Sequence, residues 1–262
     1  ATVVDPPILW AYARGQVYDP SGRVVVLAGT SRSQVGLDPA ALARHLPGWK
    51  VVQLAVDGTF GAATVEDLSR DPGFRGVIIC DTLGPAEMAP ARRWNQRPHV
   101  ETYWTKRWTL EPWGYRMSAA LQERLVLLNP ALSLRAVVAS VLSSGQLPST
   151  RELTTRPDRV RLVDYQNQDT RAARQRWRTM AAELVKLDPA ARRELAAEHV
   201  RFFQEMAARL EARGSRLVLL RMPRSASLEE LYQAAFPEDE WWQAHAAHPQ
   251  LVAVDAATEP RL

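Results

Sequence analysis

The stretch that decides the fold is Arg23-Val-Val-Val-Leu-Ala-Gly-Thr-Ser-Arg-Ser33. Its apolar run, Val24 to Ala28, is short and bounded by polar residues, which is typical of a buried strand. The run ends at Gly29, where the chain turns. In an open parallel sheet, ligands bind outside the carboxyl ends of the strands. The stretch therefore predicts a strand that carries Ser31 to a ligand-binding edge.

Similar strands alternate with helices along the chain. Trp49 to Val56 and Gly76 to Asp81 are predicted strands, with a helix from about Ala62 to Arg70 between them. The alternation resumes at Arg216 to Arg221, and Leu251 to Val254 is a fifth predicted strand. Such alternation indicates a parallel sheet with right-handed crossovers. We expect an α/β protein, a three-layer sandwich around a parallel sheet of about five strands.

A long segment interrupts this alternation. Pro85 to Pro112 is rich in Pro, Trp and Arg and has no clean period. Helical stretches are then predicted at about residues 114–143, 170–187 and 189–213. We expect a single domain, residues 1–262, in which residues 86–213 form an embedded helical and irregular insertion.

Composition excludes several classes of protein. The net charge of +4 comes from arginines scattered among acidic residues, without the concentrated basic stripe of a nucleic-acid binder, so we predict no nucleic-acid partner. Cys80 is the only cysteine, which excludes an intramolecular disulfide and a cysteine-based zinc site. It lies in an apolar run and is expected to be buried. The chain begins with Ala1, as it would after removal of a signal peptide or anchor, or at a cloning boundary.

Polar residues follow each of the first three predicted strands. Ser31 follows the first, Asp57-Gly58 the second and Asp81-Thr82 the third. Because the carboxyl ends of parallel strands meet at one edge, we expect Ser31, Gly58 and Asp81 to converge. Taken alone, Gly-Thr-Ser also fits a turn that caps the following helix.

The order and spacing of these loops resemble the first three conserved blocks of SGNH (GDSL-type) hydrolases. The resemblance covers residues 20–85 and, more weakly, 214–256. It implies that Ser31 is the nucleophile and that the N–H groups of Ser31 and Gly58 form an oxyanion hole, with a third-block asparagine as a further donor. The form Gly-Thr-Ser-Arg is similar to the Gly-Ser-Ser-Arg of bacterial membrane-anchored SGNH-like proteins, several of which work with O-acyl groups on cell-surface polysaccharides. A periplasmic or other extracytoplasmic location, with an anchor upstream of Ala1, is implied.

Two features depart from the family pattern. Asp81 stands where an asparagine is expected, and an ionised carboxylate cannot donate a hydrogen bond, so Thr82 or a backbone N–H would have to substitute. The family also carries its general base in an Asp-x-x-His element after the last strand, but residues 255–262 contain no histidine. We expect this element beyond Leu262; the alternative is a degenerate relative.

The five histidines do not match the family position. Two lie on predicted helices, one in the irregular segment, and two just before the last strand, where we expect them at the edge opposite the active loops. The two on predicted helices are His45 and His199, the one in the irregular segment is His99, and the two before the last strand are His245 and His248.

Arginines and aromatic residues are the remaining candidates. Arg32 and Arg221 lie at predicted carboxyl ends of strands, so we expect them to line one pocket with Asp57 and Asp81 and to hold an anionic or sugar ligand; exposed surface arginines are the alternative. An aromatic cluster fits stacking on sugar rings, a membrane interface or the packing of a long loop. Its members are Trp94, Tyr103, Trp104, Trp108, Trp113 and Tyr115. Trp241-Trp242 is expected to pack in the core.

The sequence therefore predicts an SGNH-like serine esterase or O-acyltransferase that acts on acyl groups, such as acetyl, of an extracytoplasmic carbohydrate or a small acyl ester. No metal or organic cofactor is implied. The alternative is a non-catalytic SGNH-like module that binds glycan or a membrane-bound acyltransferase. A nucleotide-binding role is disfavoured because the first loop lacks the Gly-x-Gly-x-x-Gly spacing.

Overall fold

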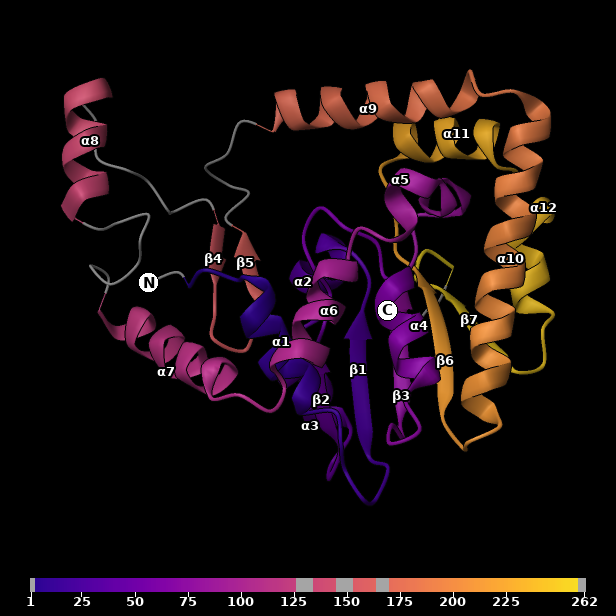
Figure 1. Ribbon diagram of the computed structural model, residues 1–262. Helices are drawn as coiled ribbons and strands as arrows, with labels where there is room; N and C mark the ends of the chain where they lie inside the picture. Colours follow the sequence, from indigo (N-terminus) through magenta and orange to yellow (C-terminus); the bar gives the residue numbers. More distant parts are fainter. Residues whose placement is uncertain (1–2, 126–133, 145–152, 164–169, 259–262) are drawn as a thin grey trace. The chain divides into compact units, whose positions relative to one another are not determined.

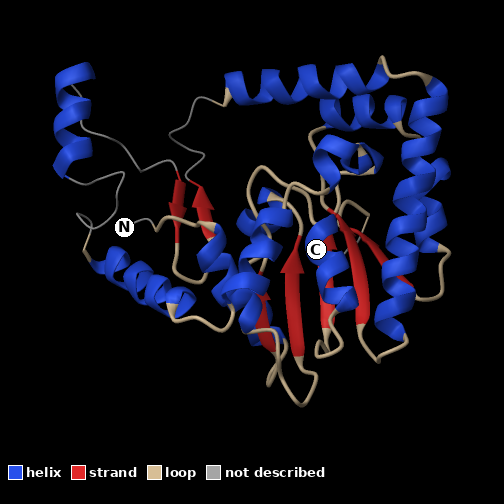
Figure 2. Ribbon diagram, in the orientation of Figure 1, coloured by secondary structure: helices blue, strands red, loops and turns tan. Residues whose placement is uncertain are grey.

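The computed structural model describes residues 3–125, 134–144, 153–163 and 170–258 (Figures 1 and 2). The chain divides into two compact units. The larger holds Val17–Arg97 and Thr170–Leu262, and the smaller holds Ala1–Gln16 and Pro98–Asp169. The predicted insertion, residues 86–213, is thus shared between the two units, and the N-terminal residues join its middle part.

A five-stranded parallel sheet forms the centre of the larger unit, in the order β2-β1-β3-β6-β7. This confirms the predicted α/β class and the predicted strands. No described residue between 86 and 213 adds a strand to this sheet. The strands are β1 (Val24–Ala28), β2 (Lys50–Gln53), β3 (Val77–Asp81), β6 (Arg216–Arg221) and β7 (Leu251–Asp255).

The crossover helices cover the sheet on both faces. The chain leaves β1 toward β2 and then crosses back to β3, so right-handed connections place the first helices and the later ones on opposite faces. Figure 1 shows α4 and α10 on one face, where they pack on each other. The helices of this unit are α2 (Ser31–Gly36), α3 (Pro39–His45), α4 (Ala62–Arg70), η1 (Pro85–Met88), α5 (Pro90–Arg93), α9 (Arg171–Val185), α10 (Pro189–Glu211), α11 (Ala226–Ala235) and α12 (Glu238–Ala246).

Helix α10 belongs to the sheet because of its apolar stripe. Buried residues recur at helical spacing along it, namely Ala196, His199, Phe203, Met206 and Leu210. They pack against η1, α4, α12 and β6. A helix that covers a sheet face in this way is a crossover connection, which is why this part of the predicted insertion lies in the larger unit.

The smaller unit is mostly helical. Its core contains Val3, Leu9 and Ala119, with Tyr115 packed against them. A buried ion pair joins Asp5 to Arg159, with Nε 2.6 Å from Oδ1. The elements are α1 (Pro7–Gly15), α6 (Arg97–Lys106, whose first residue falls in the larger unit), α7 (Glu111–Arg124), α8 (Leu134–Ser144) and the antiparallel pair β4 (Leu153–Thr155) and β5 (Arg161–Val163).

The predicted helix from 114 to 143 corresponds to α7 and α8, and the residues between them, 126–133, lie outside the described residues. The predicted loop-rich return to the sheet also falls largely outside them, apart from the β4–β5 pair. None of the helices in the described ranges combines the length and the apolar character that a bilayer span needs.

The central strand should dominate stability. Ile78, on β3, is completely buried, whereas Val252, on the edge strand β7, is 42% exposed. Removing a buried side chain leaves a cavity, so we expect Ile78→Ala to lower the free energy of unfolding by about 2–5 kcal/mol, and Val252→Ala by less than about 1 kcal/mol. Urea unfolding followed by circular dichroism measures both values. Equal losses would contradict the assigned strand order.

Candidate functional site

The first strand carries Ser31 to the edge where the carboxyl ends of the parallel strands meet (Figure 1). β1 lies between β2 and β3, and the connections that follow β1 and β2 run in opposite directions along the sheet. Such a reversal marks the ligand-binding position of open α/β sheets. Ser31 is the first residue of α2 and is half-buried. The predicted nucleophile position therefore lies at this switch point.

A buried carboxylate holds the loop that carries Ser31. Asp81, the last residue of β3, accepts hydrogen bonds from the N–H and the hydroxyl of Thr30, both at 2.7 Å. Burial raises the pKa of Asp81, and the guanidinium of Arg32 and the Thr30 donors oppose that rise. The Asp81 side chain has no exposed surface. It therefore supports the Ser31 loop, whereas the sequence predicted it as a pocket residue.

The contact with Asp81 also explains the glycine before Thr30. Gly29 has φ of 117°, and a Cβ at this position would lie 2.0 Å from Oδ1 of Asp81. Neither the backbone conformation nor the space allows a side chain. The tight turn is therefore built jointly by Gly29, Thr30 and Asp81.

The second loop is tied to the first by two adjacent amides from the irregular segment. The Nε2 of Gln96 donates to the carbonyl of Gly29 at 2.9 Å and to Oγ1 of Thr59 at 2.8 Å. Asn95 accepts from the N–H of Phe60 at 3.0 Å. Sequence reasoning missed both amides, because neither their type nor their spacing marks them as buried supports.

Two backbone donors remain available at this edge. Within the part of the chain that the structure describes, the N–H groups of Ser31 and Gly58 make no hydrogen bond. Gly58, with φ of 70°, and Asp57 are both exposed at the tip of the second loop. Ser31 and Gly58 are the residues predicted to form the oxyanion hole, and both retain a free donor.

Thr82, the third predicted oxyanion donor, is engaged elsewhere. Its N–H bonds to the carbonyl of Leu220 at 3.0 Å, and its hydroxyl donates to Oε1 of Glu87 at 2.5 Å. The hydroxyl also accepts from the N–H of Gly84 at 2.9 Å. Thr82 thus has no donor left for an oxyanion in this conformation, because it belongs to a different polar cluster.

That cluster is a buried chain of hydrogen bonds made by Thr82, Glu87, His199 and His245. Nε2 of His199 lies 2.9 Å from Oε1 of Glu87, and its Nδ1 lies 2.9 Å from Nε2 of His245. Burial raises the pKa of Glu87 to about 7 and lowers those of His199 and His245 to about 3 and about 2. Both imidazoles are therefore neutral, and Nδ1 of His245 has no hydrogen-bond partner among the described residues.

The predicted position of His245 is wrong. The sequence placed it at the edge opposite the active loops, yet it reaches the third loop through His199. The reason is that α12 packs along α10 and brings the two rings together. Glu87 was also missed; a single acid between Ala86 and Met88 was the one available signal.

Among the described residues, no histidine takes the position of a general base for Ser31. Within the described ranges, the Ser31 hydroxyl makes no hydrogen bond to any side chain. His99 belongs to the smaller unit, where it packs edge-on against Trp10, and burial lowers its pKa to about 4. Of the two others, His45 is exposed at the end of α3, and His248 lies just before β7.

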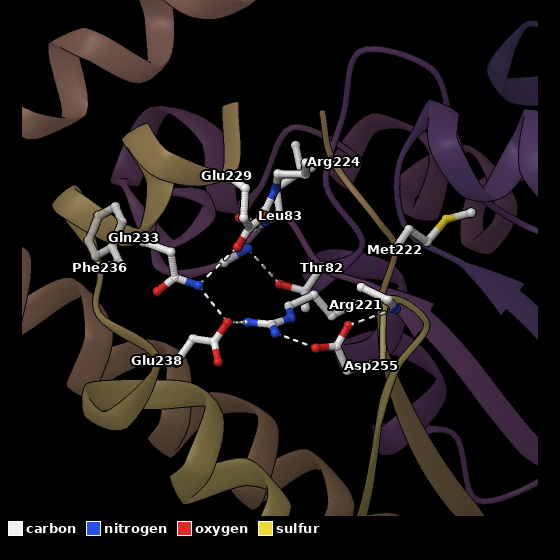
Figure 3. A network of polar contacts seen from close by, with 12 residues as sticks. Thr82, Leu83, Arg221, Met222, Arg224, Glu229, Gln233, Phe236, Glu238 and Asp255 are labelled. Atoms are coloured by element: carbon white, nitrogen blue, oxygen red, sulfur yellow. Dashed lines mark hydrogen bonds and ion pairs between the residues drawn. The ribbon is translucent and has the colours of Figure 1, made fainter. Parts of the chain in front are cut away.

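The two predicted pocket arginines have different surroundings. Arg221 is buried and forms ion pairs with both Glu238 and Asp255, as Figure 3 shows. These ion pairs join Arg221 to α12, through Glu238, and to the end of β7, through Asp255. Arg32, next to Ser31, keeps 23% of its side chain exposed and lies 3.7 Å from Asp81. Only Arg32 remains available to a ligand.

The aromatic residues do not form one cluster. Trp94 packs on Phe202 of α10, in the larger unit. Tyr103, Trp104, Trp108, Trp113 and Tyr115 lie in the smaller unit. Trp108 is 87% exposed and Trp113 57% exposed, so neither packs in a core. Trp241 and Trp242 are buried, as predicted.

Comparisons with known proteins name no family for the chain: no family model matches it, and no curated protein is similar to it. Among the described residues, no group of His, Cys, Asp and Glu is arranged to hold a metal ion. The edge offers a half-buried hydroxyl, two backbone donors and a partly exposed guanidinium. These groups suit the binding of an acyl carbonyl or an anion.

Two glycines at this edge allow a matched test of the turn. Gly29→Ala introduces a positive-φ alanine and a clash with Asp81, whereas Gly58→Ala introduces only the strained φ, since no atom lies within 4 Å of its Cβ. We expect Gly58→Ala to cost about 1–2 kcal/mol of unfolding free energy and Gly29→Ala at least about 2 kcal/mol more. Chemical denaturation measures both. Equal costs would show that Asp81 does not enclose residue 29.

The histidine pair should make stability depend on pH. Because the pKa of His245 falls from 6.5 to about 2 on folding, the unfolded state binds more protons below about pH 6.5, and stability falls as the pH is lowered. His199 acts in the same direction. Glu87 acts oppositely: its pKa rises from 4.5 to about 7, so it lowers stability as the pH rises through that window.

Replacing one imidazole should reduce the acid sensitivity. In His245→Gln, we expect the slope of unfolding free energy against pH between about 6 and 4 to fall by roughly 1.4 kcal/mol per pH unit, the value for one proton. Denaturation at several pH values measures the slope, with exposed His45→Gln as the control. The same slope in His245→Gln and in the unmodified protein would mean that His245 is not neutral when buried.

Proposed function

We propose that this chain is the α/β domain of an SGNH-like serine esterase or O-acyltransferase that acts on acyl groups of an extracytoplasmic carbohydrate. The observation that carries the proposal is the position of Ser31. Ser31 is half-buried and lies at the switch point of the sheet, on a turn fixed by Asp81, and the N–H groups of Ser31 and of Gly58, on the next loop of the same edge, make no hydrogen bond among the described residues. A nucleophile with pre-positioned oxyanion donors is what acyl transfer requires.

The proposed reaction begins with attack of the Ser31 hydroxyl on an acyl carbonyl. The N–H groups of Ser31 and Gly58 would stabilise the negative charge that develops on the carbonyl oxygen. The Ser31 proton must pass to a base, for which a histidine oriented by an aspartate is the family's expected solution. The described residues place no such histidine at Ser31. When the tetrahedral intermediate collapses, the bond to the donor alcohol breaks, that alcohol leaves with the proton, and the acyl group remains on Ser31. Water or a sugar hydroxyl then attacks the acyl-serine and releases the Ser31 hydroxyl, and the choice of acceptor separates esterase from transferase.

The same missing base favours a second candidate, a non-catalytic module. A serine without a base is a weak nucleophile. Such a module would use the Ser31 edge to bind acylated glycan, or would attach to a membrane-bound acyltransferase. In both proposals the protein works outside the cytoplasm, in keeping with the form Gly29-Thr-Ser-Arg32.

The experiment is an acyl-transfer assay on the protein in the full length that its gene encodes. We expect acetyl release from p-nitrophenyl acetate and from an acetylated polysaccharide, and a fall in kcat/KM of at least about 10³-fold in Ser31→Ala. Ser225→Ala is the matched control, because Ser225 is exposed and its side chain caps no backbone group. Equal activity in Ser31→Ala and the unmodified protein would exclude the catalytic proposal. Binding of the polysaccharide without any release would favour the module.

A further inference from the structure

Two arginines at the same sheet edge differ in how fully their charge is compensated. Arg221 contacts two carboxylates, those of Glu238 and Asp255 (Figure 3). Its guanidinium also lies over the ring of Trp242, 5.1 Å from the ring centre. Two ionic partners raise the pKa of Arg221, although burial opposes them. Arg221 is therefore a structural residue whose donors are occupied.

Arg32 has much weaker partners. Its Nη2 donates to the carbonyl of Met222 at 3.3 Å, and its Nε lies 3.7 Å from Oδ2 of Asp81, beyond hydrogen-bond distance. Among the described residues, Nε is buried without a hydrogen-bond partner. Asp81 already accepts two hydrogen bonds from Thr30. Burial lowers the pKa of Arg32, and the carboxylate of Asp81 opposes that fall.

More positive charge lies close by. Arg224 donates to the carbonyl of Leu83 at 2.6 Å and pairs with Glu229 at 3.0 Å (Figure 3). Its guanidinium also lies over the ring of Tyr232, 4.2 Å from the ring centre. Its charge acts on Arg32 and lowers the pKa of that guanidinium further.

Arg92, on α5, contributes to the same positive potential, since its charge, like those of Arg224 and Arg32, lowers the pKa of the Tyr232 phenol. The carboxylates recorded against these arginines among the described residues are Asp81 and Glu87, which act on Arg32, and Glu229, which pairs with Arg224. Burial raises the pKa of Glu87 to about 7, so Glu87 is only partly ionised near neutral pH and opposes the three guanidinium charges only in part.

We propose that the edge beside Ser31 binds a carboxylate of the carbohydrate through Arg32, with Arg224 and Arg92 supplying the surrounding positive charge. The substrate would then be an acidic, uronate-containing glycan. A carboxylate matches the planar donors of a guanidinium, and its negative charge would complement the weakly paired charge of Arg32. This inference rests on the proposed function for its carbohydrate, but the carboxylate site itself does not depend on catalysis.

The test compares an acidic ligand with its neutral counterpart. The probes are oligogalacturonate and the same oligosaccharide with methyl-esterified carboxylates, and isothermal titration calorimetry measures Kd at low salt. We expect the unmodified protein to bind the acid at least about 10-fold more tightly than the ester, because a charge-assisted hydrogen bond is lost in the ester. Arg32→Gln should weaken binding of the acid by a similar factor and leave the ester unchanged.

Control variants separate this effect from general charge and from misfolding. Arg44→Gln removes one charge from an exposed arginine on α3, and we expect less than a two-fold change. Arg32→Lys keeps the charge and should restore part of the affinity. Equal Kd values for acid and ester, or no effect in a folded Arg32→Gln, would overturn the proposal. Inorganic phosphate that competes as well as the oligogalacturonate would overturn the assignment to a carboxylate.

Failure of this inference can be told from failure of the proposed function. If Ser31→Ala binds oligogalacturonate normally and no acetyl release is found in any form, the carboxylate site stands and the catalytic function fails. If acetyl release depends on Ser31 but acid and ester substrates react equally well in both Arg32→Gln and the unmodified protein, the carboxylate site fails and the catalytic function stands.

Discussion

The pair of hydrogen bonds from Thr30 to the buried carboxylate of Asp81 is the interaction on which the edge depends. It joins the ends of β1 and β3, the two strands between which the sheet reverses direction. It requires glycine at position 29, because any Cβ there would meet the carboxylate. Ser31 follows directly, so its placement at the edge results from the way Asp81 holds the preceding residue.

The same interaction shapes the electrostatics around Ser31. Both oxygens of Asp81 accept hydrogen bonds from Thr30, and the nearer one lies 3.7 Å from Nε of Arg32, beyond hydrogen-bond distance. Thr82, the next residue, turns to Glu87 and His199 and is unavailable to a ligand. The edge therefore combines backbone donors that make no hydrogen bond among the described residues with the weakly paired guanidinium of Arg32. Such a combination favours an electron-rich carbonyl or a carboxylate and disfavours a cationic ligand.

The sheet could be predicted from sequence because each strand is a short apolar run with its own boundaries. The supports of the site could not, because they join residues far apart in the chain: Asp81 is 51 residues from Thr30, and Gln96 is 67 residues from Gly29. The type of a polar residue does not indicate which hydrogen-bond partner it will have in the folded chain. The position of His245 was predicted wrongly for the same reason, because it depends on how α12 packs against α10.

The most direct test of the central claim, that Ser31 is a reactive nucleophile at this edge, is covalent labelling with a fluorophosphonate. After labelling of the protein in the full length that its gene encodes, trypsin should release the peptide from Val24 to Arg32, in which Ser31 is the only serine. We expect mass spectrometry to find the adduct on this peptide, and Ser31→Ala to abolish it. An adduct on another peptide, or none at all, would contradict the assignment of Ser31 as the nucleophile.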